Sequence, residues 1–325
     1  MRRVATMTVG LAYLVAVGCG GGDDGTVSAQ PGGTGATSST VSRTEVGEGY
    51  SPVSAVDAHA AIGDDASRIR EALAQAKSGA VDWAAVRRHW QEGGASKKGD
   101  GSTRTLAALV PAADVVRSVE EAIDGAGSST GASDTVRAQR VDKGITVILA
   151  RKVVDELSAA EGKVGDGKLD RQSGAPHNVD EAWAFLIAKG QGPAATAEKR
   201  AVDFNRQGKV LEPILAGLAS AQQAAIAGDR TALADSARSV REGLDYVFYL
   251  ATQKYLGSDN EAGRAEGAAF YLGISPRVGQ ASSQADVAIT SAFATGDADA
   301  GRRALHDPAV LSALAVDDQE RVDRP

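Results

Sequence analysis

The sequence has a single cysteine, Cys19, among 325 residues. One thiol excludes a disulfide framework and a thiolate zinc cluster, because both need several cysteines. Aromatic residues make up only 4% of the chain, so Ala, Val, Leu and Ile must supply most of the core, a composition typical of helices. Basic residues are in deficit, and a net charge of −7 argues against a nucleic-acid surface. We therefore expect an all-α fold.

Two motifs of common enzyme classes are also absent. The sequence contains no His-Glu-x-x-His zinc motif and no phosphate-binding loop. A metalloenzyme would need an open coordination position beside a general base, and no motif marks one. We expect a protein that is not an enzyme.

The first 18 residues predict an export signal. Arg2 and Arg3 precede an apolar run from Val9 to Val17, which is too short for a permanent membrane helix. Cys19 follows small residues, an arrangement that resembles the bacterial lipobox and predicts lipidation at Cys19. An ordinary secretory signal with an incidental cysteine is the alternative. The sequence thus predicts a lipid anchor that holds the protein in the cell envelope, facing the periplasm or the exterior.

Residues 19–52 are dense in Gly, Ser and Thr and predict a flexible tether. From residue 53 the apolar spacing becomes helical. We predict helices over 62–76, 81–92, 141–157, 211–226, 231–240, 241–256, 283–295 and 308–315. Loops are predicted at 93–104, 124–134 and 162–175.

Two short patterns recur in the same order. Val141-x-x-Gly-Ile matches Val240-x-x-Gly-Leu, and Glu181-x-x-Ala-Phe matches Glu266-x-x-Ala-Phe. The repetition predicts two related helical bundles in tandem, over 53–205 and 206–315, before a polar tail over 316–325. Chance matches in an alanine-rich chain are the alternative.

The stretch from His177 to Phe185 is the first candidate site. Asn178 and Glu181 have the spacing of a capping box at a helix start. His177 and Glu181 are four residues apart, so both can approach one side of the first turn, and imidazole with carboxylate suits a hard or borderline metal ion. The alternative is that Asp180 and Glu181 only complement the helix dipole.

Further candidates come from the second half of the chain. Glu266 lies between small residues on an apolar helix, and a buried carboxylate needs a proton, a cation or a metal. Tyr246 and Tyr249 fall on one side of the predicted helix 241–256, and phenolate oxygens suit ferric iron. As an alternative, such tyrosines are core-edge residues with hydrogen-bonded hydroxyls. Lys199 and Arg200 could hold an anion or form a solvated charged face.

Several segments together carry a resemblance to a known family. HNVDEAWAF, ATAEKRAVDF, LDYVFYLATQKYL and AEGAAFYLGISP resemble boxes of the algal iron-assimilating, or phytotransferrin, domain family of low-iron-inducible periplasmic and surface proteins. The likeness extends over residues 55–300, although Val179 and Ala268 replace aromatic residues of the family boxes.

This resemblance implies capture of Fe(3+) outside the plasma membrane, with carbonate as a possible co-anion. It points to metal ligands at His177, Asp180, Glu181 and Glu266 and to an anion site at Lys199 and Arg200. We therefore expect an envelope-anchored protein that captures ferric iron for uptake, with a transport partner that the sequence does not identify. The alternative is a structural or interaction lipoprotein without metal.

Overall fold

A computed structural model describes residues 49–111, 114–317 and 321–322, all within one compact unit, Ala36–Pro325. Their regular elements are helices, and pairing of extended backbone is limited to one isolated bridge between Lys97 and Thr103. The prediction of an all-α fold is confirmed. The predicted signal, Cys19 and nearly all of the tether lie outside the described residues, as does most of the predicted polar tail.

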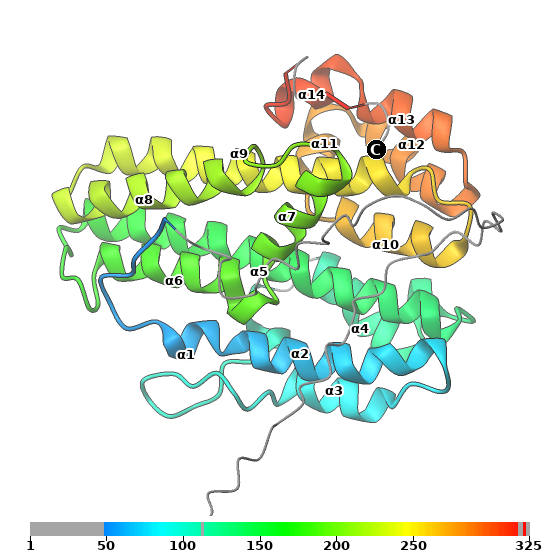
Figure 1. Ribbon diagram of the computed structural model, residues 1–325, viewed down its shortest axis with the longest axis horizontal. Helices are drawn as coiled ribbons and strands as arrows, with labels where there is room; N and C mark the ends of the chain where they lie inside the picture. The colour runs from blue at the N-terminus through cyan, green and yellow to red at the C-terminus, as the bar shows by residue number, and fades with distance from the viewer. Residues whose placement is uncertain (1–48, 112–113, 318–320, 323–325) are drawn as a thin grey trace, which may run out of the picture. The chain divides into compact units, whose positions relative to one another are not determined.

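The helices follow one another along the chain, and the longest connection links α3 to α4 (Figure 1). The first six are α1 (Asp57–Ala60), α2 (Ile62–Leu73), α3 (Trp83–Gln91), α4 (Asp114–Asp124), α5 (Asp134–Gly165) and α6 (Ala175–Ile187). The next four are α7 (Pro193–Asp203), α8 (Leu211–Ala227), α9 (Arg230–Tyr255) and α10 (Glu261–Tyr271). The last four are α11 (Ser275–Ala281), α12 (Ser283–Thr295), α13 (Ala298–Leu305) and α14 (Pro308–Ala313).

The long helix α5 lies at the centre of the packing. Its apolar middle is buried, as the all-round hydrophobic pattern over 141–157 predicts. Ser133 caps its start by accepting a hydrogen bond from the backbone amide of Val136. The helix continues to Gly165, so the loop predicted from residue 162 begins later than expected. Helix α5 therefore presents several buried turns to α4, α6, α9 and α10.

Helix α9 shows that the prediction of two helices over 231–240 and 241–256 is wrong. The chain from Arg230 to Tyr255 forms one continuous helix that passes through Gly243. A Cβ atom at Gly243 would lie 2.5 Å from Ile214 of α8, so glycine is needed there for close approach of the two helices. Gly243 therefore serves the packing of α9 on α8.

A second glycine has the same use between α4 and α5. A Cβ atom at Gly144 would lie 2.3 Å from Val119 of α4. Gly144 and Gly243 are the matched glycines of the repeated sequence pattern, and each lets a long helix pack against the helix that precedes it. This correspondence is consistent with a duplication.

The helices of both halves share one continuous hydrophobic core. Helix α6 packs on α5 and α8, and α9 packs on α5, α8 and α10 (Figure 1). The division into bundles over 53–205 and 206–315 stays a prediction. Helix α1 lies against α6, which brings the start of the described chain to the face where the candidate site lies. Within the described residues, no helix combines the length and the apolar character needed to cross a bilayer.

Candidate functional site

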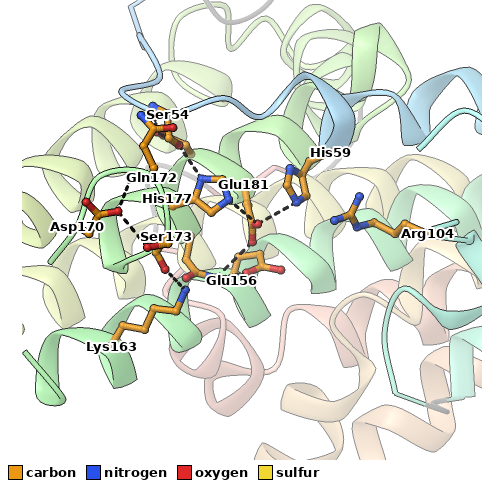
Figure 2. A network of polar contacts seen from close by, with 12 residues as sticks. Ser54, His59, Arg104, Glu156, Lys163, Asp170, Gln172, Ser173, His177 and Glu181 are labelled. Carbon is orange, nitrogen blue, oxygen red and sulfur yellow. Dashed lines mark hydrogen bonds and ion pairs between the residues drawn. The ribbon is translucent and has the colours of Figure 1, made fainter. Parts of the chain in front are cut away.

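Two histidines and a glutamate converge between α1 and α6. The Nε2 atom of His59 lies 2.8 Å from Oε1 of Glu181, and the Nε2 atom of His177 lies 3.1 Å from the same oxygen. The three potential ligand atoms all lie within 4.8 Å of one another. Figure 2 shows both imidazoles directed at the Glu181 carboxylate from opposite sides. The structure thus brings together the predicted pair His177 and Glu181 and adds His59.

A second carboxylate, Glu156 of α5, lies beside Glu181. The amide of Asn178 bridges the two, donating to Oε2 of Glu156 at 2.5 Å and to Oε2 of Glu181 at 3.3 Å. Lys152 pairs with the other oxygen of Glu156 at 2.6 Å. Burial, together with the neighbouring Glu181 carboxylate, raises the pKa of Glu156. Glu156 is therefore the member of this pair that holds a proton more readily.

The pKa of Glu181 is shifted in the opposite direction, downward. Burial alone would raise its pKa, but hydrogen bonds from His59 and Glu156 and the charge of the two imidazoles lower the pKa of Glu181 to about 2. The carboxylate is consequently ionised over the physiological range, ready to bind a cation.

The local sequence of α6 explains this placement. The helix begins at Ala175 after Gly174, with Pro176 in its first turn, where a missing backbone N–H costs nothing. The capping box predicted for Asn178 and Glu181 is wrong, because both residues lie inside the helix. Their side chains are consequently free to reach Glu156 and the histidines.

Asp180 is not one of the three converging groups and instead organises the segment that carries His59. Its carboxylate is fully buried and accepts hydrogen bonds from the backbone amides of Val53 and Ser54 at 2.9 and 2.8 Å. The hydroxyls of Tyr50 and Ser54 donate to it at 2.7 and 2.6 Å, and the amide of Gln222 donates at 2.8 Å. We call residues 50–60 the N-terminal strap. Asp180 fastens this strap to α6, and the structure does not place it beside the predicted ligands.

Ser54 of the strap also fixes the orientation of His177. Its hydroxyl hydrogen is used in the bond to Asp180, so at 2.8 Å from Nδ1 of His177 its oxygen must accept a hydrogen from that nitrogen. A neutral His177 therefore carries its hydrogen on Nδ1 and directs the lone pair of Nε2 at Glu181. An outer-shell acceptor that sets the tautomer in this way is a regular feature of histidine metal ligands.

The electrostatics of the cluster call for a cation. Within the described residues, Glu181 forms ion pairs with the two imidazoles and none with a lysine or arginine. The side chains of His59, Glu181 and His177 are 13, 14 and 18% exposed, so water screens them only in part. A metal ion between the three groups, or a second proton on His177, would remove the repulsion between the Nε2 lone pair of His177 and the Glu181 carboxylate.

Arg104 approaches the same cluster from the loop after α3 (Figure 2). Burial lowers the pKa of this guanidinium, while the negative charges of Glu181 and Glu156 oppose the lowering. Its Nη1 group is held by the hydroxyl of Ser96 at 2.8 Å. Arg104 thus places a positive charge within electrostatic range of both carboxylates without an ion pair to either.

The other predicted carboxylate, Glu266 of α10, lies in a separate buried network. Its Oε1 atom is 3.2 Å from Nζ of Lys143 and accepts a hydrogen bond from Tyr255 at 2.6 Å. Lys143 and Glu156 are both on α5, thirteen residues or about 20 Å apart along the helix. Glu181 and Glu266 therefore do not converge, and a lysine of the chain supplies the cation that a buried Glu266 requires.

The predicted anion residues belong to the network around Glu266. Arg200 is buried and pairs with Asp203 at 2.9 Å. Lys199 is near Lys143, Arg200 and Glu266, and burial together with the nearby positive charges lowers its pKa. Neither residue lies at the His59 cluster.

The two predicted tyrosine ligands also lie elsewhere. Tyr246 and Tyr249 are buried on α9 with their rings stacked at 6.1 Å. Tyr249 lies against His306 and accepts a hydrogen bond from the backbone of Val322. Tyr249 is thus in contact with C-terminal residues, and neither tyrosine belongs to the His59 cluster.

Sequence reasoning missed His59, Glu156, Ser54 and Arg104. His59 stands 118 positions before His177, so no local spacing joins them. One signal was available, because the chain has only four histidines and a metal site that uses one of them is prone to use another. The remaining three residues are of common types in ordinary contexts and become visible only through the packing of α1 and α5 on α6.

Comparison with known proteins identifies the family of the chain. A family model described as low iron-inducible periplasmic protein matches residues 26–234. The match includes the His59 cluster, Lys199 and Arg200 but ends before Tyr246 and Glu266. No curated protein and no solved structure matches the chain.

Proposed function

Since the chain belongs to the family of low iron-inducible periplasmic proteins, we propose that it captures iron at His59, His177 and Glu181. A periplasmic protein that is made when iron is scarce would serve the cell by binding iron before the metal diffuses away. The cluster supports this role, because it combines two imidazoles with a carboxylate, a donor set that suits iron among the first-row metals.

The observation that carries the proposal is the convergence of three ligand atoms within 4.8 Å around a carboxylate that has no lysine or arginine partner among the described residues. Glu156 adds a second hard oxygen donor nearby once it loses its proton. Carboxylate oxygens favour the ferric state, and we propose Fe(3+) as the cargo.

Three protein ligands leave coordination positions for water or a small anion. Arg104 is the cation best placed to hold such an anion beside the metal, and we propose it in place of Lys199 and Arg200 as the carbonate-binding residue. The low exposure of the cluster leaves room for an ion rather than for an organic substrate. The proposed role is therefore binding without catalysis, on a lipid-anchored protein that hands its metal to a transport partner.

Metal titration of the purified mature chain tests this function. The protein is stripped with a chelator and titrated with ferric nitrilotriacetate, with and without bicarbonate, and separately with Fe(2+) and Zn(2+). We expect H59A and H177A each to lower iron affinity at least a hundredfold, while H89A, a histidine of α3 outside the cluster, leaves it unchanged. No tyrosinate-to-iron absorption band is expected.

The structural alternative gives a different result. A protein without a metal role shows no affinity for any of the ions and no rise in melting temperature when iron is added, since a ligand that binds only the folded state must stabilise it. Wild-type affinity in both H59A and H177A would also remove iron from this cluster.

A further inference from the structure

A pocket of about 330 Å³ lies between the chain before α4 and helices α5, α9 and α11, apart from the iron cluster. Its inner wall is apolar and includes Val110, Ala150, Leu244 and Phe248, all of which are buried residues. This volume falls in the range of pockets that hold small organic ligands. A ligand that fills this pocket would therefore place an apolar group against this wall.

The charged groups of the pocket are unbalanced. Three arginines line it, Arg151, Arg241 and Arg277, against two carboxylates, Asp155 and Asp245. Lining groups alone therefore leave one positive charge in excess.

The partners of each arginine identify which guanidinium is uncommitted. Arg277 forms an ion pair with Asp245 and also donates to the backbone oxygen of Ala313. Arg151 donates to the backbone oxygen of Leu272 at 2.9 Å and is attracted to Asp114 at the start of α4 and to Asp155. Among the described residues, Arg241 forms no hydrogen bond or ion pair, and its charge acts on Asp245 only through space.

A neutral or positively charged ligand would leave this guanidinium uncompensated. An anionic group would pair with it, and guanidinium groups bind carboxylates and sulfonates through parallel hydrogen bonds. Burial also raises the pKa of Asp245, so at mildly acidic pH the pocket becomes still more positive. Perturbed acids beside an apolar pocket are a common mark of ligand sites.

The geometry points to a second binding site in this pocket, for a small organic anion whose apolar body lies against Leu244 and Phe248 and whose acidic group pairs with Arg241. The site is independent of the proposed iron function, because it shares no residue with the His59 cluster.

Calorimetric titration of the mature chain with 2-naphthoate tests the site, and 2-naphthamide serves as the uncharged isostere. We expect naphthoate to bind wild type at least tenfold more tightly than naphthamide does, and R241Q to remove this preference. R238Q is the matched control, since Arg238 precedes Arg241 by one helical turn on α9 and pairs with Asp235 at the surface. It should bind like wild type.

A filling variant locates the ligand. V154F places a ring in the pocket from its partly exposed wall and should abolish naphthoate binding while iron affinity stays at the wild-type value. Melting temperatures verify that each variant is folded. Absence of naphthoate binding to wild type at millimolar concentration overturns the proposal. Equal binding of acid and amide, or wild-type affinity in R241Q or V154F, overturns it as well.

Discussion

Replacing Asp180 with asparagine should weaken iron binding although Asp180 does not touch the proposed metal position. The less disruptive orientation of the new amide keeps its oxygen toward Val53 and Ser54, so its NH₂ group faces Tyr50 and Gln222. Those two side chains donate to Asp180 at 2.7 and 2.8 Å, and both bonds would be lost. Hydrogen bonds to a charged group contribute about 1.5–3 kcal/mol each.

Tyr50 and Gln222 can rearrange and recover part of this loss. We therefore expect the free energy of strap docking to become less favourable by about 3 kcal/mol, the upper value for one hydrogen bond to a charged group. Because 1.4 kcal/mol corresponds to a factor of ten, the fraction of molecules with a docked strap falls by at most about a hundredfold relative to undocked ones. His59 leaves the cluster with the strap, so the apparent iron affinity should fall by roughly ten- to a hundredfold.

Two measurements separate this effect from general loss of stability. Competition with a chelator gives the iron affinity, and hydrogen exchange gives the protection of residues 53–60. D286N is the matched control, because Asp286 also accepts a hydrogen bond from a tyrosine, Tyr271, at 2.6 Å, but on α12. If D180N retains wild-type affinity and wild-type protection of the strap, the reasoning is refuted.

Three further variants test other groups. E266Q should keep wild-type iron affinity while lowering the melting temperature, because Glu266 neutralises Lys143 in a network of its own; a large loss of affinity in a chelator competition would return Glu266 to the metal site. E156Q should release fewer protons on iron loading than wild type in a weakly buffered pH measurement, since the pKa of Glu156 is raised by burial and by Glu181. The iron affinity of wild type should accordingly rise with pH more steeply than that of E156Q. Equal slopes of affinity against pH in the two proteins would contradict this. In wild type, burial raises the pKa of Asp245 to about 6 even though Arg277 opposes it. The native state then binds this proton more tightly than the unfolded chain, so the free energy of unfolding falls by up to about 3 kcal/mol as the pH rises from about 4 to 6. Thermal unfolding of D245N should lack this fall, and an identical pH dependence in both proteins would remove Asp245 as its source.

The sequence predicted the helical class well because helix periodicity is a local signal. The stripes over 62–76 and 283–295 became α2 and α12 nearly at the expected bounds. Errors arose where a tertiary contact decided the outcome. The predicted break between 240 and 241 does not occur, because the chain stays helical from Arg230 to Tyr255, where Gly243 allows close contact with Ile214 of α8.

The site was predictable only as far as one helix reaches. His177 and Glu181 could be paired because their spacing places both on one side of α6. His59, Ser54 and Glu156 reach the same place through the packing of the strap and α5, which no spacing within α6 encodes. Asp180 shows the same limit, because its neighbours in sequence gave no indication that it binds the strap.

A comparison of the two matched glutamates, Glu181 and Glu266, shows which groups balance the charge of each carboxylate. Glu181 and Glu266 occupy equivalent positions in the predicted duplication, and Glu156 and Tyr255 are separated by the same 99 positions as Gly144 and Gly243. Each glutamate is hydrogen-bonded to the residue at that second position, Glu181 to Glu156 and Glu266 to Tyr255. In the second half a phenol and Lys143 meet the carboxylate, and the charge is balanced by the chain. In the first half a second carboxylate and two imidazoles take their place. Lys152 pairs with Glu156, whereas the ion-pair partners of Glu181 itself are the two imidazoles, which are weak bases. A bound cation would further stabilise a carboxylate whose ion-pair partners are weak bases, and this difference between the halves is the physical reason why we propose iron at Glu181 and not at Glu266.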